Sequence, residues 1–402
     1  MNKELLARFE ELKSKGFSLD MTRGKPSKEQ LDLSMPMLDV LNSKSDMMSK
    51  NVDTRNYGAL DGIEECKALF AELLGVSSKN VIVFGNSSLN AMYECISDSY
   101  IYGVNGNTPW SKLNKVKWLC PVPGYDRHFA ILEHLGIEMI NIPMTKVGPD
   151  MDLVEQYVKD PGVKGIWCVP KYSNPTGITY SNEVVERFAK LKPAAKDFRI
   201  YWDNAYLVHD LYEDKKDELV NIMELVKKYN NEDLVYEFFS TSKISFPGSG
   251  IAVLVSSESN LNHIRNHLKF KIISYDKINE LRHVRYFKNS IGLIEQSKKH
   301  ANILRPKFEY IEKRLKEVEG LISCSSPLGG YFISIYIPNK AKDVIARCKE
   351  CGLTLTEAGC AYPYHKDPNN SHIRLAPSYM EMSELKIAID ILILAIQIEI
   401  KK

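Results

Sequence analysis

Apolar segments of strand length alternate with amphipathic segments of helical length through the middle of this 402-residue chain. The segments with strand character are Val81–Phe84, Val116–Cys120, Glu138–Ile142, Gly165–Val169, Arg199–Trp202, Leu234–Phe239 and Ile251–Val255. Segments of helical periodicity lie between them, at Asp61–Leu74, Leu89–Tyr100, Asp126–Leu135 and Asn182–Lys190. Because near-continuous apolar strands must be covered on both faces, this order predicts an α/β fold with a large, mostly parallel seven-stranded sheet.

The alternation ends near residue 290, where a different pattern begins. A long helical segment at Ser297–Leu315 is followed by strand candidates at Tyr331–Ile337 and His372–Leu375, with a helix at Ala341–Lys349 between them. This pattern predicts a small α+β domain formed by residues 291–402 together with residues 1–45, which contribute an N-terminal lip. Residues 46–290 are expected to form the large α/β domain.

Charge and hydropathy exclude several classes of protein. The formal net charge of +2 gives no sign of a nucleic-acid surface. The chain starts with an amphipathic helical pattern instead of the unbroken apolar stretch of a signal peptide. Leu385–Ile400 is interrupted by charges and falls short of the roughly 20 residues that span a membrane. We expect a buried terminal element there, either helix or strand, and no membrane segment.

The eight cysteines are scattered without the spacing of a disulfide framework. One Cys-x-x-Cys pair, Cys348 and Cys351, lacks a second pair at zinc-site spacing. Reduced thiols in a cytoplasmic protein are therefore expected, and no metal site.

Polar side chains follow five of the predicted strands. They are Asn86, Ser87 and Ser88, then Tyr125, Asn174, Asp203 with Tyr206, and Ser240, Ser242 and Lys243. Ligands of open α/β sheets bind beyond the carboxyl ends of the strands, so these residues predict one shared site.

Each of these residues can be interpreted either as part of a reactive or binding site or as an ordinary structural residue. A desolvated lysine such as Lys243 is a nucleophile that forms a Schiff base with an aldehyde, although most lysines are solvated surface charges. Asp203 ends a very apolar strand, where a carboxylate needs a cationic partner, or else caps a helix or turn. Asn86 to Ser88 precede a helix and suit either an anion site or simple N-capping.

Two further residues complete the candidate site. Tyr125 offers a flat aromatic face for stacking. Arg374 alternates with apolar neighbours in a strand, so it requires either a substrate carboxylate or an internal salt bridge.

Taken together, these motifs resemble class I aminotransferases of fold type I, which depend on pyridoxal 5'-phosphate. The subgroup that the chain most resembles is the type Ic aspartate aminotransferases, which are similar to the C-terminal half of MocR-type transcription regulators. The resemblance runs nearly end to end and rests on LDMTRGKPS, RNYGALDGIEECK, FGNSSLNAM, PGYDRHFAILEHLGIEM, SNPTGITYS, WDNAYLVHDL, STSKISFPGSGIA, PLGGYFIS and IRLAPSY.

The resemblance implies a role for each residue. Lys243 would form the Schiff base, Asp203 would pair with the ring nitrogen, and Tyr125 would stack on the ring. The ring oxygen would bind Asn174 and Tyr206. The phosphate would bind Asn86, Ser87, Ser88, Ser240 and Ser242. A homodimer is implied, in which Tyr57 reaches the phosphate of the partner subunit. Arg374 would bind the substrate α-carboxylate, with Asn174 and Gly24 also facing the substrate.

The chain departs from the family pattern in two places. The arginine that usually pairs with the phosphate is missing near Ser249, and nothing in the sequence identifies its substitute. No arginine matches the one that selects dicarboxylates, for which Arg23 and Lys25 are candidates.

The expected activity is a ping-pong transfer of an amino group from an L-amino acid, such as aspartate, to a 2-oxo acid such as 2-oxoglutarate. The alternatives are a lyase or racemase of the same fold, or a non-catalytic sensor that binds the same cofactor.

Overall fold

Eight strands form the central sheet of the computed structural model, which describes residues 3–400. In spatial order they are β4 (Val81–Val83), β11 (Ala252–Val255), β10 (Val235–Ser240), β9 (Arg199–Asp203), β8 (Val163–Cys168), β5 (Lys117–Val122), β6 (Glu138–Thr145) and β7 (Gly148–Pro149). Neighbours from β10 to β6 pair in parallel, whereas β11 is antiparallel to both of its neighbours. The mostly parallel sheet is confirmed, and the two-residue β7 adds an edge strand that was not predicted.

The strands from β4 to β5 in this order are buried on both faces, as the predicted α/β fold requires, whereas β6 near the edge is partly exposed. On β9, Ile200 and Trp202 belong to one hydrophobic cluster, while Tyr201 belongs to another on the opposite face. This alternation follows from the two-residue period of a strand. Helices of the sheet region are α3 (Glu64–Leu74), α4 (Ser88–Tyr102), α5 (Asp126–His134), α6 (Met151–Tyr157), α7 (Asn182–Ala189), α8 (Ile222–Lys228), α9 (Glu258–Leu268) and α10 (Lys277–Phe287).

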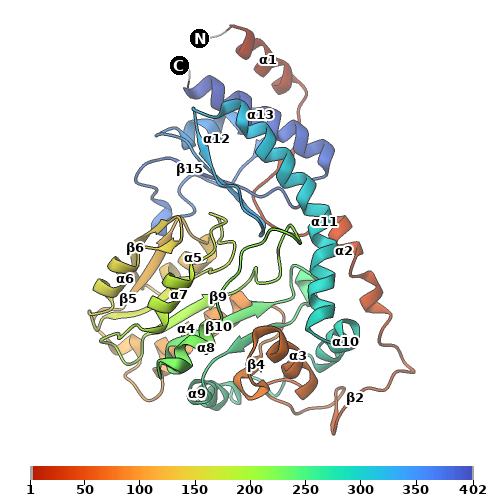
Figure 1. Ribbon diagram of the computed structural model, residues 1–402, viewed down its shortest axis with the longest axis vertical. Helices are drawn as coiled ribbons and strands as arrows, with labels where there is room; N and C mark the ends of the chain where they lie inside the picture. The colour runs from red at the N-terminus through yellow and green to blue at the C-terminus, as the bar shows by residue number, and fades with distance from the viewer. Residues whose placement is uncertain (1–2, 401–402) are drawn as a thin grey trace.

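A third hydrophobic cluster combines the two ends of the chain. It packs Phe9 of the N-terminal segment with α11 (Ser290–Leu315) and α13 (Met382–Ile400). The other elements of this part are α1 (Lys3–Ser14), α12 (Ala341–Glu350), β1 (Leu19–Asp20) paired with β14 (Leu353–Thr354), and the antiparallel sheet of β12 (Ser323–Cys324), β13 (Ile333–Tyr336) and β15 (His372–Leu375). Figure 1 shows α1 beside α13 at the end of the molecule where both termini lie. The division at residues 45/46 and 290/291 stays a prediction.

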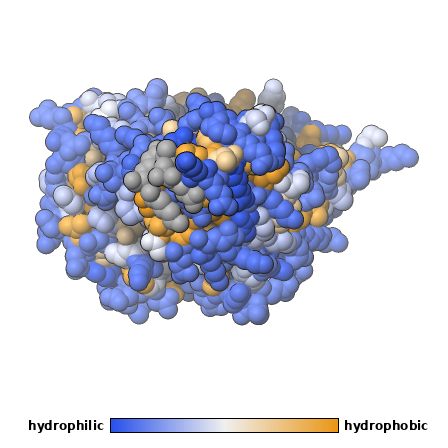
Figure 2. Space-filling model, turned by 90° about the horizontal axis from the view of Figure 1, so that it is seen from above, coloured by the Kyte–Doolittle hydropathy of each residue, from blue (hydrophilic) through white to orange (hydrophobic). Residues whose placement is uncertain are grey.

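The segment at Leu385–Ile400 belongs to α13 and is therefore a helix, where the sequence left both helix and strand open. Most of its apolar side chains are buried, because they contact the helices and the small sheet around them. Within residues 3–400, no helix combines the length and the apolar character needed to cross a membrane. The surface at this end of the molecule is mostly hydrophilic, with scattered hydrophobic areas (Figure 2).

Short elements connect these two parts of the molecule. They are α2 (Lys28–Asp32), β2 (Met48–Ser49) and β3 (Val52–Asp53). Helix α11 begins at Ser290, seven residues before the predicted start, because the side chain of Asn289 caps it by accepting a hydrogen bond from the Gly292 N–H.

A buried carboxyl group in β10 leads to a testable pH dependence of stability. The Glu237 Oε1 atom accepts a hydrogen bond from Asn204 Nδ2 at 2.9 Å, while Oε2 has no partner within the described residues. Burial raises the pKa of Glu237 from 4.5 to about 7, against the smaller opposing effect of the Asn204 hydrogen bond. The folded protein therefore binds more protons than the unfolded chain between these two values, and its stability falls as pH rises through that range.

We expect Glu237→Gln to remove this loss of stability. At pH 8 the variant should be more stable than the parent by about 3 kcal/mol, from a shift of about 2.5 pKa units. Below pH 4.5 the difference should nearly vanish, because the Glu237 carboxyl is then mostly protonated, and so neutral, in both the folded and the unfolded chain. Urea unfolding of both proteins from pH 4.5 to 8 measures the difference, with the exposed Glu133→Gln as control. Parallel stability curves for parent and variant would contradict the argument.

Candidate functional site

A pocket of about 560 Å³ lies at the carboxyl ends of the parallel strands. Tyr125 follows β5, Asn174 follows β8, Asp203 ends β9 and Ser240 ends β10, and these strands are neighbours in the sheet. Eleven of the predicted site residues line this pocket, namely Gly24, Ser87, Ser88, Tyr125, Asn174, Asp203, Tyr206, Ser240, Ser242, Lys243 and Arg374.

Lys243 lies in a turn directly after β10. The turn is held by the Thr241 carbonyl, which accepts hydrogen bonds from the N–H groups of Ile244 and Ser245 at 2.9 and 2.8 Å. The Nζ atom lies 4.9 Å from the ring centre of Tyr206. Desolvation lowers the pKa of Lys243, and the negative charge of Asp203 opposes this shift only in part. This environment favours the neutral amine that a nucleophile or a base requires.

Asp203 lines the same pocket, and its charge acts on this lysine. Its Oδ2 atom lies 3.1 Å from Nε2 of His128, and the His128 ring stacks on Trp167 with 4.1 Å between ring centres. The other carboxylate oxygen, Oδ1, is buried without a hydrogen-bond partner among the described residues. A buried oxygen of this kind is costly unless a donor reaches it. The protonated ring nitrogen of the predicted cofactor is a donor of the required charge, so this part of the site fits the group.

Two phenols and one amide surround the space above Asp203. Burial raises the pKa of Tyr206 well above its usual value and that of Tyr125 to about 12. Both side chains are therefore neutral hydrogen-bond donors near pH 7. The Oδ1 atom of Asn174 accepts a hydrogen bond from Arg374 Nη1 at 3.4 Å, which connects this group to the substrate side of the pocket.

The other end of the pocket is rich in hydroxyl groups and backbone donors. Ser87 is the N-cap residue of α4, but its side chain makes no capping hydrogen bond. The Ser242 hydroxyl donates to the carbonyl of Asn86 at 3.0 Å, and Asn86 Nδ2 donates to the Gly248 carbonyl at 3.3 Å. The N-terminus of a fifteen-residue helix, with serine hydroxyls beside it, can hold a phosphate. Asn86 supports this end from behind and is not among the pocket-lining residues.

Arg374 in β15 faces the pocket from the part of the molecule that contains both chain ends. Its Nη1 atom forms an ion pair with Asp126 Oδ1 at 2.8 Å, and Nη2 donates to the carbonyl of Thr22 at 3.3 Å. The Nε atom is buried without a partner within residues 3–400. Of the two readings that the sequence left open, the internal salt bridge is present. The unpartnered Nε still leaves a donor for a carboxylate ligand.

The N-terminal lip contributes residues 22–25 to the lining of the pocket. Gly24 lies so close to Phe332 that a Cβ atom at this position would come within 2.5 Å of the aromatic ring. Arg23 and Lys25 also line the pocket, with Lys25 Nζ 3.7 Å from the ring centre of Tyr379. Glycine is therefore required for the lip to approach the rest of the site.

Besides Asn86, Tyr57 is a predicted residue that does not line this pocket. Its side chain is 78% exposed on the loop between β3 and α3. Sequence reasoning in turn missed Asp126, His128, Arg127, Thr356 and Glu357, four of which line the pocket while His128 lies behind Asp203. His128 occupies an apolar position of an amphipathic helix, and nothing in the local sequence marks it as the partner of Asp203.

Comparison with known proteins gives consistent matches. The chain matches the family model described as aspartate amino-transferase over residues 1–402. It is 45% identical over 396 residues to an aspartate aminotransferase of Corynebacterium glutamicum, which covers 97% of this chain and 91% of that protein. A putative aminotransferase of Mycolicibacterium smegmatis is 44% identical over 391 residues, with 95% and 91% coverage.

Similar folds are found among solved structures. The crystal structure of an aspartate transaminase from Corynebacterium glutamicum superposes with a TM-score of 0.94 at 44% identity, covering 98% of this chain and 94% of that one. An α-aminoadipate aminotransferase from Thermus thermophilus, solved with a phosphopyridoxyl-leucine compound, has a TM-score of 0.76 at 17% identity, with 98% and 94% coverage. The similarity to the Thermus thermophilus structure, at 17% identity, is evidence for a shared fold only.

Proposed function

Because this chain belongs to the aspartate aminotransferase family, we propose that it transfers the amino group of an L-amino acid to a 2-oxo acid with pyridoxal 5'-phosphate as cofactor. The resemblance noted in the sequence is confirmed, and the chain is a transaminase. The observation that carries the choice of cofactor is the buried, unpartnered Oδ1 atom of Asp203 opposite a desolvated lysine.

The pocket offers a partner for each part of this cofactor. Asp203 would hold the ring nitrogen in its protonated form, while Tyr206 and Asn174 would hydrogen-bond the ring oxygen. Tyr125 would stack on the ring, and the hydroxyl-rich end at Ser87, Ser88, Ser240 and Ser242 would bind the phosphate. When bound, the cofactor supplies an aldehyde and an electron sink for charge that develops at the substrate α-carbon.

The chain's own groups then bind and orient the substrate and move its proton. Lys243, with its lowered pKa, would take the proton from the substrate α-carbon as a general base, hold it on Nζ and release it again as a general acid. Arg374 would bind the α-carboxylate through Nε and fix the orientation of the α-carbon beside Lys243. The lip at Gly24 and the ring of Phe332 cover the site and exclude water.

For the substrates, we propose aspartate as donor and 2-oxoglutarate as acceptor, because the relatives at 45% and 44% identity include aspartate aminotransferases. A side-chain carboxylate needs a cation, and Arg23 and Lys25 on the lip, with Arg127 opposite, are cationic pocket residues that could supply it.

A half-reaction screen tests this proposal. The purified holoenzyme is mixed with each of the twenty amino acids, and the absorbance of the cofactor is followed until the amino group has moved onto it. We expect aspartate and glutamate to react at least about 100-fold faster than alanine or leucine, since a buried charge pair contributes a few kcal/mol. Equal rates with apolar amino acids would contradict the dicarboxylate assignment, and no reaction with any amino acid would contradict the transfer itself.

We also propose that the protein works as a homodimer. Tyr57 is exposed, as are the large apolar side chains of Phe270 (83%) and Ile273 (62%), which a second copy of the chain could cover. Tyr57 would then reach the phosphate of the partner subunit. Sedimentation velocity measures the state of association, and a monomer at micromolar concentration would contradict it. The cytoplasmic location stays a prediction from the scattered cysteines.

A further inference from the structure

Arg282 in α10 is a half-buried cation without an anion. Its Nη2 atom donates to the Ser249 hydroxyl at 2.5 Å and to Asn279 Oδ1, and both of these acceptors are neutral. Within residues 3–400, its buried Nε atom has no hydrogen-bond partner and no carboxylate forms an ion pair with Arg282. Burial lowers the pKa of this guanidinium, opposed by the more distant charge of Asp276. A buried charge of this kind is costly, so its position requires an explanation.

The Ser249 hydroxyl that Arg282 contacts belongs to a turn next to the hydroxyl-rich end of the pocket, where Ser87, Ser88, Ser240 and Ser242 lie. The Gly248 carbonyl of this turn accepts the hydrogen bond from Asn86. Gly250 lies so close to Ser242 that a Cβ atom would come within 3.1 Å of the Ser242 Oγ, Cα and N atoms. A long side chain from Gly250 would therefore displace Ser242. Since the Ser249 hydroxyl is directed to α10, this turn cannot itself provide a cation to the site.

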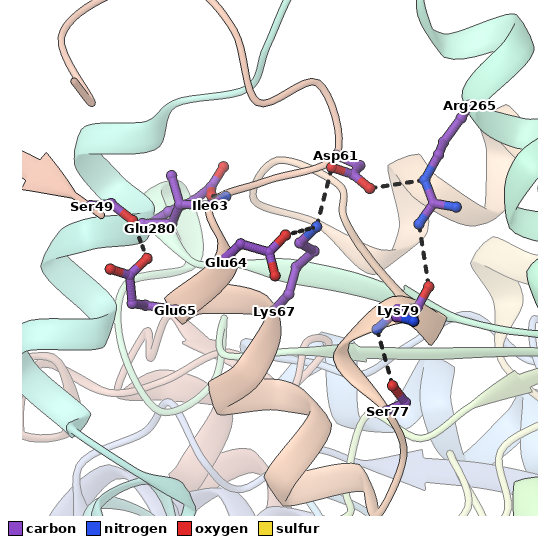
Figure 3. Close-up of polar contacts among 10 residues, drawn as sticks. All are labelled: Ser49, Asp61, Ile63, Glu64, Glu65, Lys67, Ser77, Lys79, Arg265 and Glu280. Atoms are coloured by element: carbon purple, nitrogen blue, oxygen red, sulfur yellow. Dashed lines mark hydrogen bonds and ion pairs between the residues drawn. The ribbon is translucent and has the colours of Figure 1, made fainter. Parts of the chain in front are cut away.

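Helix α10 is held firmly against both this turn and the lysine turn. Asn279 Nδ2 donates to the Gly250 carbonyl at 2.9 Å, and His283 Nε2 lies 3.3 Å from the Ser245 hydroxyl. At the other side of the helix, Glu280 Oε2 accepts a hydrogen bond from the Ile63 N–H at 2.7 Å. Figure 3 shows Glu280 beside Ile63 at the start of α3. Residues before and after Arg282 therefore fix the place of its guanidinium.

We propose that Arg282 supplies the positive charge that neutralises the phosphate of the cofactor, with Ser249 and Asn279 holding the guanidinium at the back of the hydroxyl-rich end. This inference rests on the proposed function. Helix N-terminal N–H groups and serine hydroxyls give directed hydrogen bonds but no net charge, whereas a phosphate brings close to two negative charges. Salt screens the charge of a partly buried guanidinium less than that of an exposed one, so Arg282 would keep its attraction for the phosphate at ordinary ionic strength.

The proposal answers the question that the sequence left open near Ser249. The turn after Lys243 contains no arginine, and the cation would come instead from Arg282, which lies 33 residues after Ser249 in the sequence. Ser249 would then help to position the cation, because its hydroxyl accepts a hydrogen bond from Arg282 instead of facing the ligand.

The test compares two forms of the cofactor on apo-protein, with and without the phosphate group. Pyridoxal 5'-phosphate and pyridoxal are titrated into wild-type, Arg282→Gln and Arg285→Gln proteins, and the dissociation constants are read from absorbance and protein fluorescence. Arg285 is an exposed arginine of the same helix and serves as the matched control. We expect Arg282→Gln to weaken the phosphorylated form by about 10- to 100-fold and pyridoxal by less than about 3-fold. Arg285→Gln should change neither constant.

Several outcomes would overturn the proposal. An equal loss for both ligands would show a structural role, and no loss for either would show that another group neutralises the phosphate. A variant that becomes monomeric while keeping its cofactor affinity would assign Arg282 to a carboxylate of the partner subunit. If wild-type protein binds neither ligand, the proposed function fails together with this inference. If wild type binds and Arg282→Gln binds equally well, this inference alone fails.

A second variant covers the case in which Arg282→Gln does not fold. Arg282→Lys keeps the charge and loses the planar fork, so it should retain part of the preference for the phosphorylated ligand. Thermal unfolding of the wild-type apo-protein adds an independent measurement. Inorganic phosphate should raise the midpoint more than chloride at the same ionic strength, and the lysine variant should reduce this difference. Equal midpoints of wild-type protein in the two salts would contradict a phosphate site.

Discussion

Replacement of Lys243 by alanine is expected to slow amino transfer by about 1,000-fold or more, because in the proposed reaction one amine would both bond to the cofactor and move the substrate proton. The structure makes this lysine suited to the task through desolvation, which lowers its pKa, and through a turn that fixes its backbone. Truncation to alanine removes a partly buried amine that has no hydrogen-bond partner in residues 3–400. We therefore expect little change in the stability of the apo-protein.

Single-turnover kinetics with aspartate measures this effect, and thermal unfolding measures the stability. The exposed Lys269→Ala is a matched control, which should leave both quantities unchanged. The Lys243→Ala protein should also lose the near-visible absorbance that depends on the covalent link to the lysine. Transfer at the parental rate in Lys243→Ala would overturn the assignment of the site.

Replacement of Arg374 by alanine is expected to lower kcat/KM for amino acids by about 100-fold or more, since truncating one member of a buried charge pair costs about 2–5 kcal/mol. The ion pair with Asp126 complicates this variant, because its loss leaves a carboxylate in the pocket without a partner. Arg374→Lys should recover little, as a lysine cannot reproduce the planar fork that would allow Arg374 to bind a substrate carboxylate while it keeps its ion pair with Asp126.

A substrate comparison separates the two roles of Arg374. The parental enzyme should prefer an amino acid to the amine of the same side chain that lacks the α-carboxylate, and Arg374→Ala should abolish most of that preference. Asp126→Asn keeps the arginine and loses the ion pair, so it should keep the preference while lowering stability. If Arg374→Ala destabilises the protein but keeps the full preference, the arginine is structural and the carboxylate binds elsewhere.

The fold was predicted well where a local pattern is enough to specify an element. The seven main strands were found because each is a short apolar run with turn residues at its ends, and β15 was predicted with its exact bounds. Element boundaries were less accurate. The start of α11 was missed by seven residues because Ile291, Leu293 and Ile294 in its first two turns do not follow a clear helical period, and β7 was missed because two residues form no pattern.

The gathering of the site residues was also predictable, from the rule that parallel strands end at the same edge of a sheet. The partners of those residues were not. Asp203 and His128 are 75 residues apart, and Arg374 and Asp126 are 248 residues apart. Such contacts depend on how helices pack on the sheet and how the two parts of the chain meet, and one sequence carries no local signal of either.

Tyr57 shows the remaining limit. A residue whose predicted partner lies in another subunit is exposed in the isolated chain, and neither its neighbours nor its burial reveals what it contacts.

The alternation of apolar strands and amphipathic helices was sufficient by itself to determine the layered α/β fold and the edge at which its polar residues collect, because burial of apolar surface acts on every element locally. The tertiary structure decided the electrostatics of that edge. Within residues 3–400 it left one oxygen of Asp203 without a donor, paired Arg374 with Asp126, and brought Arg282 of α10 to the turn that contains Ser249. These facts depend on distances between segments far apart in the chain, since the energy of a charge is determined by what surrounds it and not by its neighbours in sequence.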